Sequence, residues 1–197
     1  MSKKVGLIVP HDYKLLTIAA ILEVFETANK LSKGDKYFEI MIFQSSEQIN
    51  EERLFGYEVK AIEVSSQVLD LILIPAFTTD NMSEMISKNK NFIPWLKKQH
   101  QSGAELASFC TGAFLFAASG LLNEKLATTH VDACSAFTKA FPLVKLKAEE
   151  TLTADGSLYT SGGSTSTFHL LILLVQKYCG NEIAVQIAKI FSIDLNR

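Results

Sequence analysis

Short runs of apolar residues alternate along the chain with longer segments in which apolar residues follow helical spacing. Residues 5–9 contain no polar side chain and are ended by Pro10, and residues 70–75 enclose a second such run. Apolar runs of this length are typical of strands buried on both faces. Further strands are predicted at 38–43, 57–64, 104–109, 126–129 and 143–147.

Helical spacing is clearest in residues 15–31, where Leu15, Ile18, Leu22 and Phe25 share one face and Gly34 is expected to close the helix. Residues 151–160 alternate around Asp155-Gly156, a pair that suits a tight hairpin turn. Other helices are predicted at 83–87, 92–100, 113–119, 133–140, 165–178 and 182–191.

Strands that alternate with helices, most of them apolar throughout, predict an α/β fold. We expect a doubly wound, mostly parallel sheet with helices on both faces and one small β-hairpin. The 197 residues contain no internal repeat or linker, so residues 1–197 are expected to form a single domain.

Composition narrows the function classes. Hydrophobic residues make up 48% and charged residues 20%, and the net charge is −2 with scattered basic residues. This balance is typical of a globular domain and gives no basic patch for direct contact with DNA. The longest apolar stretch, 168–175, is far shorter than a membrane span, so no membrane contact is expected.

Three widely spaced cysteines, Cys110, Cys134 and Cys179, include no C-x-x-C pair. The pattern therefore predicts neither a disulfide framework nor a zinc site, and we expect no metal and no cofactor. A reduced, cytoplasmic location is the expectation that follows from this cysteine usage.

The most informative segment is 107–114, where a strand leads into Cys110 and small residues follow before a helix begins. This layout is typical of a nucleophile elbow, in which a sharp turn lifts one side chain above the sheet edge. The positive end of the helix would lower the pKa of the thiol from its usual ~8.5. Cys110 is therefore expected to be the most reactive of the three thiols. The alternative is a buried core cysteine.

Two histidines follow predicted strands and are candidates for the same site. His130 comes after 126–129, and His11 comes after 5–9. Parallel strands present their carboxyl ends at one edge of the sheet, so both side chains could approach Cys110. The alternatives are a structural role for His130 and a solvated loop position for His11.

Several segments of the chain resemble those of a known protein superfamily. The segments 108–115, 118–122 and 127–130 resemble the ThiJ/PfpI superfamily, which is related to the class I glutamine amidotransferases. Within it, the chain is most similar to the amino-terminal domain of AraC-type transcriptional regulators. Segments 23–29, 70–75 and 158–163 resemble the same group. The resemblance implies a flavodoxin-like, class I glutamine amidotransferase-like fold.

The resemblance also implies roles for residues. It makes Cys110 the nucleophile or oxidation site and places His130 near it. An acidic residue near the start of the first helix commonly bonds the cysteine in this superfamily, and here Thr17 occupies that place. Glycines usually follow the strand that ends at Pro75 and complete an oxyanion hole, but here the turn begins Ala76-Phe77. Both departures argue against efficient turnover.

We therefore expect the ligand-sensing and dimerising domain of an AraC-type regulator. It would bind a small metabolite without efficient turnover in a pocket at Cys110 that is lined by His11, Thr17, Ala76, Phe77 and Thr111. The alternatives are a stand-alone cysteine-dependent hydrolase or hydratase, of the amidase or isonitrile hydratase kind, and an oxidative-stress protein.

Regulators of this type continue into a helix-turn-helix module that contacts DNA. Such a module is expected after residue 197 and is absent from these 197 residues. The chain is expected either to be the sensor part of such a regulator or to be a stand-alone relative. The expected partners are a small-molecule ligand and a second copy of the chain, with DNA contacted only through the carboxy-terminal module.

Overall fold

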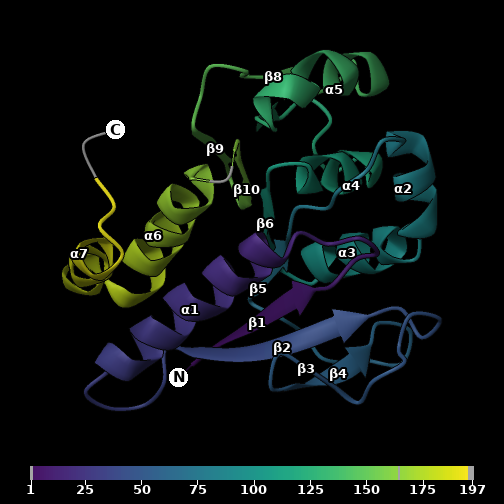
Figure 1. The fold of residues 1–197 in the computed structure, drawn as a ribbon. Helices are drawn as coiled ribbons and strands as arrows, with labels where there is room; N and C mark the ends of the chain where they lie inside the picture. The colour runs from purple at the N-terminus through teal and green to yellow at the C-terminus, as the bar shows by residue number, and fades with distance from the viewer. Residues whose placement is uncertain (1, 164, 195–197) are drawn as a thin grey trace.

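The computed structural model describes residues 2–163 and 165–194. Within them, an eight-stranded sheet has the order β3-β4-β2-β1-β5-β6-β10-β9 (Figure 1). The six strands from β4 to β10 in this order run parallel, and each edge strand pairs antiparallel. The strands are β1 (Lys3–Ile8), β2 (Phe38–Gln44), β3 (Arg53–Leu54), β4 (Tyr57–Ala61), β5 (Leu71–Ile74), β6 (Glu105–Phe109), β9 (Leu152–Asp155) and β10 (Leu158–Ser161).

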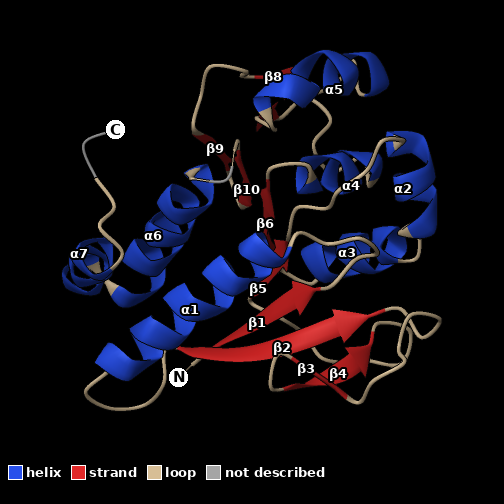
Figure 2. Ribbon diagram, in the orientation of Figure 1, coloured by secondary structure: helices blue, strands red, loops and turns tan. Residues whose placement is uncertain are grey.

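Helices cover both faces of this sheet, as Figures 1 and 2 show. One face carries α1 (Leu15–Leu31), α6 (Ser166–Cys179) and α7 (Asn181–Ile190). The other face carries α2 (Met82–Lys88), α3 (Phe92–Gln101), α4 (Gly112–Ala118), the short 3₁₀ helix η1 (Val131–Ala133) and α5 (Cys134–Ala140). The predicted doubly wound α/β fold is confirmed.

Two apolar layers hold the helices to the sheet. Leu71 and Leu73 of β5 face the layer under α1 and α6, whereas Ile72 and Ile74 face the layer under α3 and α4. All four side chains are fully buried. Successive side chains of a strand point to opposite faces, so a strand covered on both sides must be apolar at every position.

A second, two-stranded parallel sheet is formed by β7 (Leu126–Ala127) and β8 (Lys145–Leu146). The main sheet's hairpin holds it in place: the Leu126 N–H donates to Asp155 Oδ2 over 3.1 Å, and the Thr128 N–H donates to Thr160 Oγ1 over 2.6 Å. These bonds set the direction in which the chain enters the segment that contains His130.

Several predicted boundaries were wrong. The bounds predicted for α1, 15–31, are those observed, but Ser32 and not Gly34 ends the helix: Ser32 is extended, and its hydroxyl accepts from the Gly34 N–H in a local turn. Strand β4 ends at Ala61 because its partner β2 ends at Gln44, and β7 and β8 are shorter than predicted. Strand β3 carried no apolar run and was not predicted. Among the described residues, no helix has both the length and the apolar character needed to cross a membrane.

Candidate functional site

Cys110 lies directly between β6 and α4 with left-handed backbone, at φ 54°. A residue other than glycine pays about 1–3 kcal/mol for such a conformation, which persists only where its surroundings hold it. Here the Cys110 N–H donates to the Ser161 carbonyl over 2.9 Å, and its own carbonyl accepts from Thr129 Oγ1 over 3.0 Å. The predicted sharp strand-to-helix turn is therefore present, held by β10 and by the segment after β7.

Gly112, the first residue of α4, explains why a small residue follows the turn. A Cβ atom at this position would lie 2.5 Å from the Ile74 carbonyl oxygen and 2.6 Å from the Pro75 carbonyl oxygen. Both are backbone atoms at the carboxyl end of β5, which cannot swing aside as a side chain can. The start of α4 thus packs against β5 at a distance that only glycine permits.

Thr111 joins the same turn to the loop after β5. Its hydroxyl donates to the Phe77 carbonyl over 2.7 Å and accepts from the Phe77 N–H over 3.0 Å. Both polar groups of the Phe77 backbone are thereby satisfied by one side chain, and the Phe77 side chain is fully buried. Of the predicted ligand contacts, Thr111 and Phe77 are therefore brought into direct contact with each other.

The loop after β1 is held against the loop after β5 by a short antiparallel bridge between Tyr13 and Phe77. The Lys14 N–H donates to the Ala76 carbonyl and the Thr78 N–H donates to the Asp12 carbonyl, each over 2.8 Å. Two loops that come from different strands are thus fixed to each other at the carboxyl edge of the sheet. Ala76 is fully buried beneath this bridge.

Burial dominates the electrostatics of the Cys110 side chain, which is only 2% exposed. It raises the pKa of the thiol above its ordinary value, while the positive charge of Lys14 and hydrogen bonding by Thr111 lower it to a smaller extent. The prediction of a lowered pKa was wrong. The hydrogen bonds of Thr111, which precedes α4, lower the pKa in the expected direction, but removal of the sulfur from water outweighs them.

His130 directly follows Thr129, whose hydroxyl bonds the Cys110 carbonyl, but the His130 side chain is oriented by Asp132. Its Nδ1 accepts from the Asp132 N–H over 3.3 Å and lies 3.7 Å from the Asp132 carboxylate. Among the described residues, no hydrogen bond joins His130 to the Cys110 sulfur. The side chain that does bond Cys110 from this segment is that of Thr129, which is 1% exposed.

Two other predicted residues, His11 and Thr17, come from the loop after β1 and from α1. His11 is exposed, and its N–H donates to Asn89 Oδ1 over 2.8 Å. Thr17 is buried in the first turns of α1, where its side chain has no hydrogen bond to Cys110. No group of three or more histidine, cysteine or acidic side chains in the described part of the chain could hold a metal ion.

Sequence reasoning missed Thr129, Lys14 and Ser161 as parts of the site. Thr129 could have been identified from the sequence, because it stands directly before His130 at the end of the strand predicted at 126–129. Lys14 and the Ser161 carbonyl could not, because only the packing of α1 and β10 beside β6 brings them to Cys110.

Cys110 and Cys134 should differ in their rates of alkylation. Cys134 is partly exposed and Cys110 is nearly inaccessible, and burial raises the pKa of both thiols. The accessibility of the sulfur therefore decides which thiol reacts faster. We expect iodoacetamide to modify Cys134 at least about tenfold faster than Cys110 in the native protein at pH 7.5. This reverses the expectation from sequence. Mass-spectrometric labelling measures both rates, and the difference should disappear in denaturant; a faster Cys110 in the native protein would contradict this.

Comparison with known proteins gives consistent results. A family model described as the DJ-1/PfpI family matches residues 3–177. The HTH-type transcriptional regulator CdhR of Pseudomonas aeruginosa is 32% identical over 99 residues, which are 50% of this chain and 29% of the relative. The HTH-type transcriptional regulator GbdR of the same species is 21% identical over 96% of this chain and 50% of the relative.

The fold has close counterparts among solved structures. A putative transcriptional regulator protein from Vibrio parahaemolyticus aligns with a TM-score of 0.80 at 20% identity, covering 96% of this chain and 99% of that chain. At this identity the likeness establishes the fold alone. The chain spans half or less of the length of the two curated regulators described above.

Proposed function

Since the chain belongs to the DJ-1/PfpI family, we propose that it is the ligand-sensing and dimerising domain of an AraC-type transcriptional regulator. The observation that carries the proposal is a cysteine whose backbone is held in a strained turn but whose thiol is buried with a raised pKa. Such a turn shapes a binding site without supplying a ready nucleophile. Similarity to two HTH-type regulators supports the same class.

The ligand is proposed to bind at the carboxyl edge of the sheet beside Cys110. His11, Thr111 and His130 are at least partly exposed and can contact it, while Thr17, Ala76 and Phe77 are buried and support the site. The bridge between Tyr13 and Phe77 couples the two loops, so a ligand that shifts one of them also moves the other.

Efficient catalysis is not part of the proposal, because no histidine or acidic side chain in the described part of the chain forms a hydrogen bond with the Cys110 sulfur. Thr17 cannot exchange a proton near pH 7, and the Nδ1 of His130 is engaged by Asp132. One well-placed acid–base group is typically worth ~10²–10⁴ in rate, which is enough to separate a receptor from an enzyme.

Dimerisation is proposed through the start of α1. Leu15 and Leu16 are 61% and 60% exposed there and directly follow Lys14, which acts on Cys110. Covering them with a second copy would join the ligand site to the dimer, and ligand-dependent dimer geometry would couple binding to transcription. Light scattering at tens of micromolar should give a dimer mass, and a monomer mass would count against this part.

DNA contact is proposed to come from a helix-turn-helix module outside the residues described here. The regulator is proposed to be cytoplasmic. The acidic balance of this domain, with a net charge of −2, agrees with that division of labour.

The test is a metabolite-library thermal-shift screen, followed by kinetics on each hit with the parent protein and Cys110→Ser. We expect saturable binding that raises the melting temperature, with turnover well below about 1 s⁻¹. Cysteine-dependent turnover at or above that rate would overturn the sensor function and establish the hydrolase or hydratase alternative. No hit from a broad library would also count against a sensor.

A further inference from the structure

Residues 130–133, here called the strap, connect Thr129 to the first turn of α5. They comprise His130 and the single turn of η1. Val131 and Asp132 are exposed, and none of the three η1 residues is fully buried. A segment that buries so little surface opens at a lower free-energy cost than the strands and helices of the core.

The hydrogen bonds of the strap are local. The His130 carbonyl accepts from the Ala133 N–H over 2.9 Å and from Cys134 Sγ over 3.5 Å. His130 Nδ1 accepts from the Asp132 N–H over 3.3 Å. In the part of the chain that the structure describes, no hydrogen bond joins residues 130–133 to a strand of the main sheet. The strap can therefore move without breaking the sheet.

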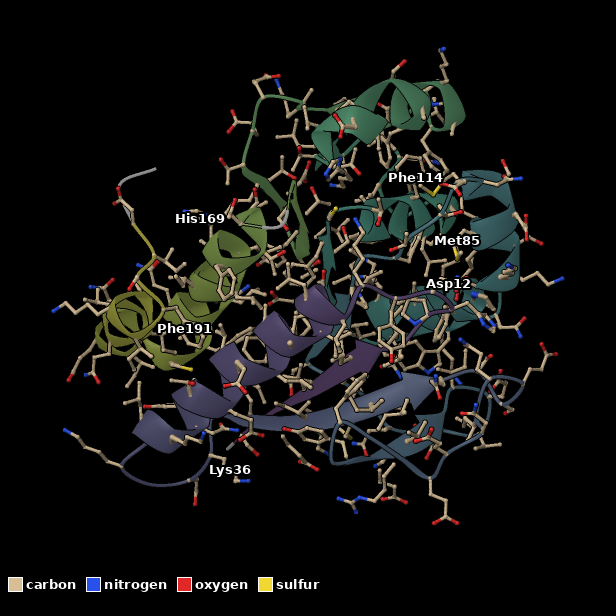
Figure 3. All side chains as sticks on the ribbon, in the orientation of Figure 1. Asp12, Lys36, Met85, Phe114, His169 and Phe191 are labelled. Carbon is tan, nitrogen blue, oxygen red and sulfur yellow. The ribbon has the colours of Figure 1, made fainter. Side chains whose placement is uncertain are left out.

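Both ends of the strap are fixed to the elbow and to the helix that follows it. Before the strap, the Thr129 hydroxyl donates to the Cys110 carbonyl over 3.0 Å, and Thr129 is 1% exposed. After the strap, the fully buried Phe137 of α5 packs edge to face on Phe114 of α4, with ring centres 5.0 Å apart. Figure 3 labels Phe114 between α4 and α5.

The Thr129 hydroxyl is the bond through which the strap reaches Cys110. The left-handed backbone of Cys110, at φ 54°, persists only while neighbouring groups hold it. The Ala113 N–H also donates to the Cys110 carbonyl, but over the longer distance of 3.3 Å. The Ser161 carbonyl holds the Cys110 N–H from β10, which is not part of the strap. Loss of the Thr129 bond therefore leaves the Cys110 carbonyl with a weaker hold.

We propose that Thr129 is a positioning residue that couples the strap to the exposure of Cys110. With the strap in place, Thr129 holds the turn and the thiol stays buried. A displaced strap draws the hydroxyl away from the Cys110 carbonyl, and the turn opens to solvent. Ligand contact with His130 is the event that displaces the strap, and this last step rests on the proposed sensor function. The coupling itself is tested without a ligand.

The first experiment measures the rate at which iodoacetamide modifies Cys110, by mass spectrometry, in a Cys134→Ser background. Serine keeps a donor for the His130 carbonyl, and the reagent then cannot disturb the strap. Because Cys110 is 2% exposed, its alkylation rate reports how often the turn opens. We expect Thr129→Val to raise this rate at least about fivefold, because valine has nearly the same shape but no hydroxyl. Thr129→Ser keeps the hydroxyl and should stay within about twofold of the background protein.

The matched control is Thr128→Val. Thr128 is fully buried beside Thr129, and its hydroxyl donates to the Glu150 carbonyl over 3.1 Å. This variant loses a comparable bond without touching Cys110, so its Cys110 rate should stay within about twofold of the background protein. A rise in Thr129→Val below about fivefold, or an equal rise in Thr128→Val, would overturn the proposal. If Thr129→Val does not fold, as judged by circular dichroism, Thr129→Ala removes the same hydroxyl and gives the same measurement.

A double-mutant cycle tests the strap itself. Val131 is 69% exposed, so Val131→Gly loosens the strap with little loss of packing. We expect it to raise the Cys110 rate at least about twofold in the background protein and to have no further effect when residue 129 is changed to valine. An unchanged rate, or the same fold-change with and without the Thr129 hydroxyl, would overturn the coupling. A metabolite screen without hits would count against the sensor function alone and leave these rates as they stand.

Discussion

Gly112→Ala is expected to destabilise the domain by about 2–3 kcal/mol and to lower its melting temperature by roughly 4–12 °C. The added Cβ would lie 2.5 Å from the Ile74 oxygen and 2.6 Å from the Pro75 oxygen, well inside contact distance. Relief requires α4 to move away from β5, since both oxygens belong to the backbone. That movement would also pull Thr111 from Phe77.

The control is Gly34→Ala. A Cβ at Gly34 would meet no atom within 4 Å, and the residue does not have left-handed backbone. Its melting temperature should stay within about 2 °C of the parent, because alanine in an unstrained loop changes stability little. Thermal melts by circular dichroism compare the two variants. If Gly112→Ala melted with Gly34→Ala, the close packing of α4 on β5 would not be a constraint.

The alkylation rate of Cys110 gives the first prediction a second readout. If α4 moves, the sulfur should become more accessible and iodoacetamide should modify it faster in Gly112→Ala than in Gly34→Ala. A lowered melting temperature with an unchanged Cys110 rate would indicate strain that is absorbed elsewhere.

The fold could be predicted from sequence because burial on both faces leaves a direct trace. In β5, Leu71, Ile72, Leu73 and Ile74 are all fully buried, and a polar residue at any of them would have shown the strand to be exposed on one side. The hairpin of β9 and β10 was equally visible, because Asp155-Gly156 has few alternatives to a tight turn. Short strands such as β3 leave no such trace.

The site could be predicted only in part. The turn at Cys110 is local, because a strand, small residues and a helix follow one another in sequence. The pKa of its thiol is not local, since it depends on burial by segments that come from distant parts of the chain. Thr129 is nineteen residues away and Phe77 thirty-three, and no spacing rule places them around the turn. The sequence-based prediction therefore overestimated how far the start of α4 lowers the pKa of the Cys110 thiol.

Thr111→Val is expected to cost about 2–4 kcal/mol, the largest effect of any change at the site that adds no bulk. Valine has nearly the shape of threonine but no hydroxyl, so the Phe77 N–H and carbonyl would lose their partners at 3.0 Å and 2.7 Å. Each polar group left unsatisfied in a buried place costs about 1–3 kcal/mol. Urea unfolding followed by circular dichroism measures the loss.

Thr111→Ser separates the hydroxyl from the methyl group. Serine keeps both bonds to Phe77 and should cost less than about 1 kcal/mol, so serine and valine should differ by at least about 1 kcal/mol. If both variants were equally destabilised, packing of the methyl group would hold the loop, and the hydroxyl would not. The comparison also bears on ligand binding. The loop after β5 stays bridged to the loop after β1 only while Phe77 is fixed, so Thr111→Val should weaken any ligand at this edge more than Thr111→Ser does.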